Sequence, residues 1–97
     1  MIVWDEPKRL ANIAKHGLDF GDLQEGFDWD SFLTDIVRPS RTGRLRYRFL
    51  GNLDGEGVVV AIVSPLGEEA VSIVSLRRAT RKERAHYETW AKDRRIQ

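Results

Sequence analysis

Residues 71–87 constrain the fold most strongly, because they read as a β-strand that passes directly into an α-helix. Val71, Ile73 and Ser75 alternate with Ser72, Val74 and Leu76, which is the period of a strand and includes several β-branched residues. Thr80 and Glu83 then have the spacing of a capping box, in which a hydroxyl and a carboxylate each accept a hydrogen bond from a backbone N–H at a helix start. We therefore expect a strand over 70–76 followed at once by a helix from Thr80 to about Arg94.

Basic residues surround this predicted junction of strand and helix. They are Arg77, Arg78, Arg81, Lys82 and Arg84. Cations gain nothing from the helix dipole at the positive, amino-terminal end of a helix. A local conflict of this kind often marks a functional site. We therefore expect an anion to bind where the strand meets the helix.

Two more strands precede the junction. The segment 44–50 alternates strictly, with Leu, Tyr and Phe on one face and basic residues on the other. These basic residues are Arg44, Arg46 and Arg48. The β-branched run over 58–63 is typical of a central strand, and turns over 51–57 and 64–69 complete an antiparallel meander. One face of such a sheet packs on helices, so the arginines are expected on the face that meets water.

The first part of the chain predicts a short edge strand over 2–4 and then two helices. Asp5 can cap a helix over 6–16 that ends at Gly17 and turns one apolar face inward. That face would consist of Leu10, Ile13 and Ala14. Asp19 can cap a second helix, which carries Phe20, Leu23 and Phe27 at helical spacing and ends in the sequence FDWD.

The predicted fold class is α+β, in a single domain over 1–97. A short strand over 32–37 precedes the meander, which gives an antiparallel sheet of about three to four strands besides the amino-terminal one. Two amino-terminal helices and one carboxy-terminal helix would pack on this sheet. The last helix carries Tyr87, Trp90 and Ala91 as its apolar patch.

Composition excludes several functional classes. The chain has no cysteine, which rules out disulfides and thiolate metal sites, and its two histidines lack metal-ligand spacing. We therefore predict neither a metal nor another cofactor. No apolar run approaches the roughly 20 residues of a membrane span, and no signal-peptide core is present, so we expect a cytoplasmic protein.

Charge is segregated along the chain although the formal net charge is only +1. Residues 1–36 hold eight acidic and three basic side chains, whereas residues 37–50 hold five arginines and no acid. Residues 51–70 hold four acids and no base, and residues 71–97 hold eight bases and three acids. Either a cationic face binds a polyanion, or the blocks meet as ion pairs on the surface of the fold.

The available side chains could bind a phosphodiester, or they could form a plain binding surface. The candidates are Arg46, Arg77, Arg78, Arg81, Lys15, His16 and Tyr87. Cations can bind and stabilise a charged phosphate, and RNA supplies its own nucleophile in the 2′-hydroxyl, so cleavage would need no metal. His16 has a simpler interpretation, in which it caps the last carbonyls of the first helix.

Two segments resemble the BrnT family of toxins. The sequence WDEPKRLANIAKHGLDF is similar to the family's amino-terminal motif W-D-x-x-K-x-x-x-N-x-x-K-H-G-x-x-F, with matches at Trp4, Asp5, Lys8, Asn12, Lys15, His16, Gly17 and Phe20. The sequence IVSLRRATRKERAHY is similar to its carboxy-terminal motif I-I-S-A-R-x-A-T-x-x-E-R-x-x-Y, with matches at Ile73, Ser75, Arg77, Ala79, Thr80, Glu83, Arg84 and Tyr87. Arg46 and Gly51 fit a weaker middle pattern. The chain departs from the family at Leu45, where an acidic residue is usual, and at Leu76, where a small one is usual.

The resemblance implies a bacterial type II toxin with a RelE-like ribonuclease fold. Such a toxin is an endoribonuclease that inhibits translation, and its 2′-hydroxyl chemistry would leave a 2′,3′-cyclic phosphate. Its partner would be a BrnA-type antitoxin with a ribbon-helix-helix DNA-binding end, in a 2:2 heterotetramer that contacts operator DNA only through the antitoxin.

Roles follow for individual residues. Arg46 and Arg77 would stabilise the phosphate and the transition state, and Lys15, His16 or Tyr87 would handle protons. Glu83 is first the capping carboxylate and second a group that orients an arginine. The expected RNA-binding residues are Arg44, Arg48, Arg78, Arg81 and Arg84. The alternative is a non-catalytic basic module that binds RNA or an acidic protein, or arginines that serve only as ion pairs within the fold.

Overall fold

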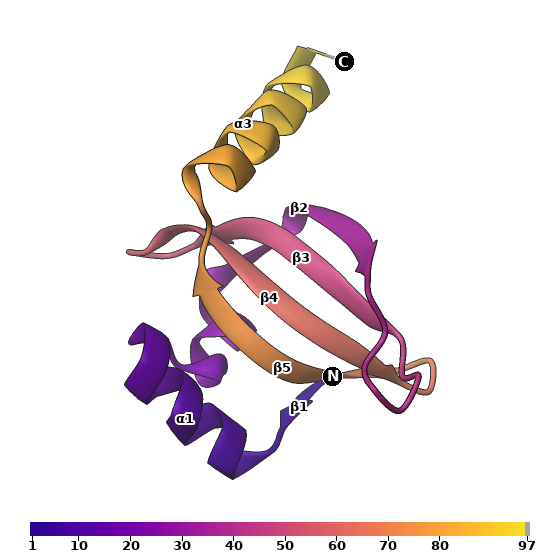
Figure 1. Cartoon of the computed structure of the whole chain (residues 1–97). Helices are drawn as coiled ribbons and strands as arrows, with labels where there is room; N and C mark the ends of the chain where they lie inside the picture. The colour runs from indigo at the N-terminus through magenta and orange to yellow at the C-terminus, as the bar shows by residue number, and fades with distance from the viewer. Residues whose placement is uncertain (97) are drawn as a thin grey trace.

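A computed structural model of the protein describes residues 1–96 and places one five-stranded sheet at its centre, with strand order β1-β5-β4-β3-β2 (Figure 1). The elements in chain order are β1 (Ile2–Trp4), α1 (Glu6–His16), the 3₁₀ turn η1 (Phe20–Asp22), α2 (Leu23–Gly26), β2 (Phe27–Val37), β3 (Arg46–Leu53), β4 (Gly57–Leu66), β5 (Ala70–Arg78) and α3 (Arg81–Ile96). Strands β2 to β5 form an antiparallel meander, and β1 pairs in parallel with β5. The α+β class and the meander predicted from the sequence are confirmed.

Several predicted boundaries were wrong. The expected second helix is only the turn η1 followed by the four residues of α2, and the FDWD segment already belongs to β2. Strand β3 runs through Gly51 to Leu53, so the turn expected over 51–57 is confined to the residues after Leu53. The reason lies at Gly51, where an added Cβ would come within 2.8 Å of the Phe27 ring, so glycine here permits close packing inside the sheet rather than a turn.

The two faces of the sheet have separate apolar cores. We call the face that carries Tyr47, Phe49 and Leu53 the aromatic face; its core includes the fully buried Phe20 and Leu23. The opposite face, which we call the arginine face, carries Arg46, Arg48 and Arg77 together with a smaller core. In that core, Tyr87 and Ala91 of α3 pack against Leu50 and Val60, as the apolar patch of the last helix predicted.

Helix α1 lies along the outer edge of β5, and Asn12 makes this contact. Its side-chain amide donates to the carbonyl of Leu76 (2.8 Å) and accepts from the Leu76 N–H (3.0 Å), so it hydrogen-bonds the strand edge as a neighbouring strand would. It also donates to the carbonyl of Leu18 (3.0 Å). The apolar face expected for this helix was wrong, because Leu10 is 55% exposed whereas Asn12 is buried.

Replacing Asn12 with alanine is expected to lower the free energy of unfolding by about 2 kcal/mol, because it leaves a buried N–H and two carbonyls without partners. Urea unfolding measures the change. Leu10→Ala on the same helix is the control and is expected to have little effect, because that side chain is exposed. An Asn12→Ala variant with the parent's urea midpoint would contradict the edge-pairing role.

Candidate functional site

Pairing of the strands brings three arginines to one face of the sheet. Val60 of β4 lies opposite Arg77 of β5 and opposite Leu50 of β3. Side chains two residues apart in a strand share a face, so Arg48 and Arg46 join Leu50 on this side. The alternation correctly placed Arg46 and Arg48 on one face, but Arg44 lies in the loop before β3. The expectation that this face meets water was wrong in part, because α3 packs on it and the Arg48 side chain is only 28% exposed.

Glu83 connects two of these arginines. Arg77 donates to both of its carboxylate oxygens, at 2.7 Å and 3.0 Å, and Arg48 donates to one of them at 3.2 Å. Arg48 also forms an ion pair with Asp35 of β2. Two guanidinium groups thus meet two carboxylates, which gives a network without net charge across β2, β3, β5 and α3.

The capping box holds Glu83 in this position. Its carboxylate accepts from the Thr80 N–H (2.9 Å), and its own N–H donates to the Thr80 hydroxyl (3.1 Å), as predicted. The hydrogen bond from Arg77 is the main reason that the pKa of Glu83 falls from its ordinary value of 4.5 to about 2, while the same contact raises the pKa of Arg77. The two roles considered for Glu83, helix cap and arginine partner, therefore occur together in the structure.

Arg46 has a different environment from Arg48 and Arg77. It forms no ion pair with any described residue and lines a hollow of about 200 Å³ on the arginine face. The other lining residues are Lys8, Ser40, Thr42, Arg44, Ser64, Ser72 and Val74. Cations and hydroxyl groups line this hollow without a carboxylate among them, so it offers an anion several hydrogen-bond donors.

Tyr87 is buried beside this face, and its hydroxyl forms two hydrogen bonds. Its hydroxyl donates to the carbonyl of Ser31 (3.0 Å) and accepts from the Asn52 amide (3.2 Å). Its ring packs near Trp90, with a centroid distance of 5.7 Å. These contacts fix the hydroxyl between β2, β3 and α3, on the same side of the sheet as Arg77.

Lys15 and His16 end α1, and neither lines the hollow with Arg46 or the one beside Tyr87. The carbonyl of His16 accepts from Arg78 (3.1 Å), which also pairs with Glu56. Arg78 follows Arg77 within β5 rather than in a linker after it, so the two side chains point to opposite faces. The structure therefore brings Arg46, Arg77, Glu83 and Tyr87 to one side of the sheet. Arg78, which contacts the end of α1, lines a separate hollow with Asn52 and Arg84.

The remaining predicted RNA-binding residues, Arg81 and Arg84, are exposed in the first turns of α3. Among the described residues, no group of three or more His, Cys, Asp or Glu side chains could hold a metal ion. None of the helices described here is long and apolar enough to cross a membrane.

Sequence reasoning missed Asp35 and Lys8 as members of the site. Asp35 contacts Arg48 through the pairing of β2 with β3, and only the register of that pair identifies it. Lys8 lies in the amino-terminal motif at a position that carried no assigned role, yet it lines the hollow with Arg46. The match of Lys8 to that motif was the sequence feature that could have identified it as a site residue.

Both the sequence and the structure are similar to those of known proteins. The family model described as "Ribonuclease toxin, BrnT, of type II toxin-antitoxin system" matches residues 4–83. The structure is similar to the 1.1 Å crystal structure of the ribonuclease toxin BrnT from Brucella abortus, with a TM-score of 0.61 and 40% sequence identity. That match covers 82% of this chain and 96% of the other. No curated protein matches the sequence.

Proposed function

The chain belongs to the BrnT family of ribonuclease toxins of type II toxin–antitoxin systems, and we propose that it cleaves RNA on its arginine face without a metal ion. The observation that carries this proposal is the environment of Arg46. It is a cation without an ion pair among the described residues, and it lines a hollow with hydroxyl groups and Lys8. Such a hollow suits one phosphate of an RNA backbone.

The proposed reaction uses the 2′-hydroxyl of the RNA as nucleophile. Its oxygen attacks the adjacent phosphorus, the bond to the 5′-oxygen of the next nucleotide breaks, and a 2′,3′-cyclic phosphate remains. Arg46 would donate hydrogen bonds to the phosphate oxygens as negative charge builds on them. Arg77, which Glu83 holds at 2.7 Å, would lie along the same face as a positioned second cation.

The reaction also needs groups that take the proton from the 2′-hydroxyl and give one to the leaving 5′-oxygen, and several residues are candidates. Tyr87 lies on the side of Arg77, but its hydroxyl is already hydrogen-bonded to Ser31 and Asn52. Lys15 and His16 are at the end of α1, where the carbonyl of His16 accepts from Arg78, and neither lines the hollow with Arg46. Lys8 in the hollow with Arg46 is therefore an additional candidate for the proton donor or acceptor.

The wider function follows from the family. We expect RNA cleavage to inhibit translation in the bacterial cytoplasm, within the RelE-like group of toxins. We expect a BrnA-type antitoxin with a ribbon-helix-helix end to bind the toxin in a 2:2 heterotetramer and to be its only link to operator DNA. Arg44, Arg48, Arg78, Arg81 and Arg84 are proposed to contact the RNA backbone.

Incubation of the purified chain with a defined RNA in excess chelator tests the proposal, with and without translating ribosomes. The expected products carry 2′,3′-cyclic phosphate ends, identified by mass spectrometry and by their resistance to a 3′-phosphatase. Cleavage that requires an added divalent metal would contradict the mechanism. Salt-dependent RNA binding without any product would instead favour a non-catalytic basic module. Neither binding nor cleavage would favour the other alternative, in which Arg48 and Arg77 act only as ion-paired residues of the fold.

A further inference from the structure

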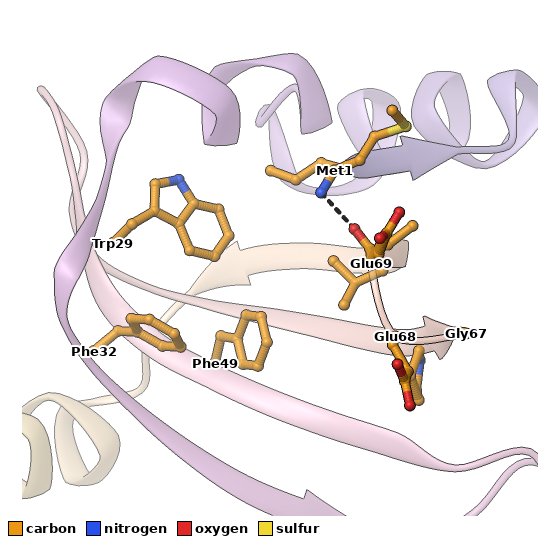
Figure 2. A pocket seen from close by; sticks show the side chains of 11 residues that line it. Met1, Trp29, Phe32, Phe49, Gly67, Glu68 and Glu69 are labelled. Atoms are coloured by element: carbon orange, nitrogen blue, oxygen red, sulfur yellow. Dashed lines mark hydrogen bonds between the residues drawn. The ribbon is translucent and has the colours of Figure 1, made fainter.

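An apolar pocket of about 450 Å³ opens on the aromatic face, opposite the arginines (Figure 2). Trp29, Phe32 and Phe49 form one wall, and the other side consists of Met1 and the turn with Glu68 and Glu69. This volume lies within the range of roughly 300–1,000 Å³ typical of ligand-binding pockets.

The aromatic wall is rigid and already formed. The rings of Trp29 and Phe32 meet edge to face at 5.5 Å, those of Phe32 and Phe49 lie 4.9 Å apart, and the Trp29 indole N–H donates to the carbonyl of Leu23 (2.8 Å). α1 follows the edge of β5, and α3 packs on the other face, so neither of these helices covers the wall. Half-buried aromatic side chains therefore remain accessible, as they do in the binding hot spots of protein interfaces.

The apolar surface continues beyond the pocket. Ile36 is 73% exposed and lies opposite Tyr47 of the same sheet face, beside Phe49. Met1 is 86% exposed at the other end. An extended apolar surface of this kind is more typical of a protein partner than of a small ligand.

The rim of the pocket carries a net negative charge, because two carboxylates stand against the single amino-terminal ammonium group. The amino terminus donates to the carbonyl of Glu69 (2.8 Å), which holds the turn against β1. The carboxylates of Glu68 and Glu69 are exposed and form no ion pair with a described residue. Like-charge repulsion disfavours a nucleic acid at this rim, whereas a basic protein segment would find partners here.

We propose that this pocket binds an apolar anchor side chain of the antitoxin, flanked by Lys or Arg residues that pair with Glu68 and Glu69. This inference rests on the type II assignment and not on the RNA-cleavage mechanism. Because the pocket and Arg46 lie on opposite faces of the sheet, the anchor adds affinity without itself covering the arginine face.

The test measures binding of purified BrnA-type antitoxin to the toxin carrying Glu68→Lys and Glu69→Lys. The exposed positions of these residues allow the variant to fold, which a thermal melt checks. Its affinity is expected to fall by about tenfold or more and to lose part of its salt dependence. Glu25→Lys with Asp54→Lys is the matched control, since it changes the charge equally at the opposite ends of the strands and is expected to bind within about twofold of the parent.

A second variant, Phe49→Ala, removes part of the aromatic wall and is expected to weaken binding as well, provided that its melt shows a folded chain. Parent-like antitoxin affinity in the charge-reversed variant would overturn the proposal. So would a parent toxin that dimerises through this pocket, or a loss of RNA binding in place of antitoxin binding. RNA cleavage by the charge-reversed variant is expected to equal that of the parent, so failure of the cleavage mechanism and failure of this inference give different results.

Discussion

Replacing Arg46 with alanine is expected to lower the rate of RNA cleavage by about 10²–10³-fold, the usual cost of removing one transition-state hydrogen-bond donor. The free energy of unfolding is expected to change by less than about 1 kcal/mol, because Arg46 has no ion pair among the described residues. Single-turnover cleavage with saturating toxin measures the rate, and urea unfolding measures the stability.

The matched control for this prediction is Arg41→Ala. Arg41 is an exposed arginine of the loop before β3 and does not line the hollow, so its removal changes the net charge equally. A parent-like rate for this control would exclude a general loss of RNA attraction. Arg46→Lys retains the charge but not the planar pair of donors, and it is expected to recover only part of the rate. If Arg46→Ala cleaves RNA at the parent's rate, the hollow around Arg46 does not take part in cleavage.

The sequence predicted the parts of the site that depend on local periodicity. Alternation over 44–50 placed Arg46 and Arg48 on the face away from Tyr47 and Phe49, and the spacing of Thr80 and Glu83 located the start of α3. Both signals are local, because a strand has a period of two and a capping box spans one helical turn.

The parts that failed depend on contacts between distant segments. Asn12 is buried in α1 because it pairs with the edge of β5 at Leu76, and no periodicity within the helix predicts a buried amide. The extent of β2 was missed because aromatic residues from Phe27 to Phe32 suit either a helix end or a strand, and only pairing with β3 decides between them. Lys15 and His16 were likewise expected near Arg46 because they belong to the amino-terminal motif, but neither lines the hollow with Arg46.

Glu83→Gln is expected to be the most destabilising single change at the site, by roughly 2–3 kcal/mol at pH 7. Glutamine preserves the size of the side chain and one oxygen for the Thr80 N–H, but it removes the charge that faces Arg77 and Arg48. The Glu83 side chain is only 14% exposed, so solvent screens this interaction weakly. Urea unfolding at pH 7 measures the loss.

The pH dependence of the free energy of unfolding shows whether Glu83 stabilises the fold through its charge or through its shape. Because the pKa of Glu83 lies at about 2 in the folded chain and at 4.5 ordinarily, the carboxylate stabilises the fold fully above about pH 4.5. That stabilisation is lost as the pH falls from 4.5 toward 2, so the parent and the Glu83→Gln variant should converge in stability over this range. Glu88→Gln on the same helix is the control, and it is expected to change the free energy of unfolding at pH 7 by less than about 0.5 kcal/mol, because Glu88 is exposed and has no ion pair among the described residues. A constant difference between parent and Glu83→Gln from pH 7 to pH 2 would mean that helix capping, and not the pairing with Arg77 and Arg48, is the stabilising role of this residue.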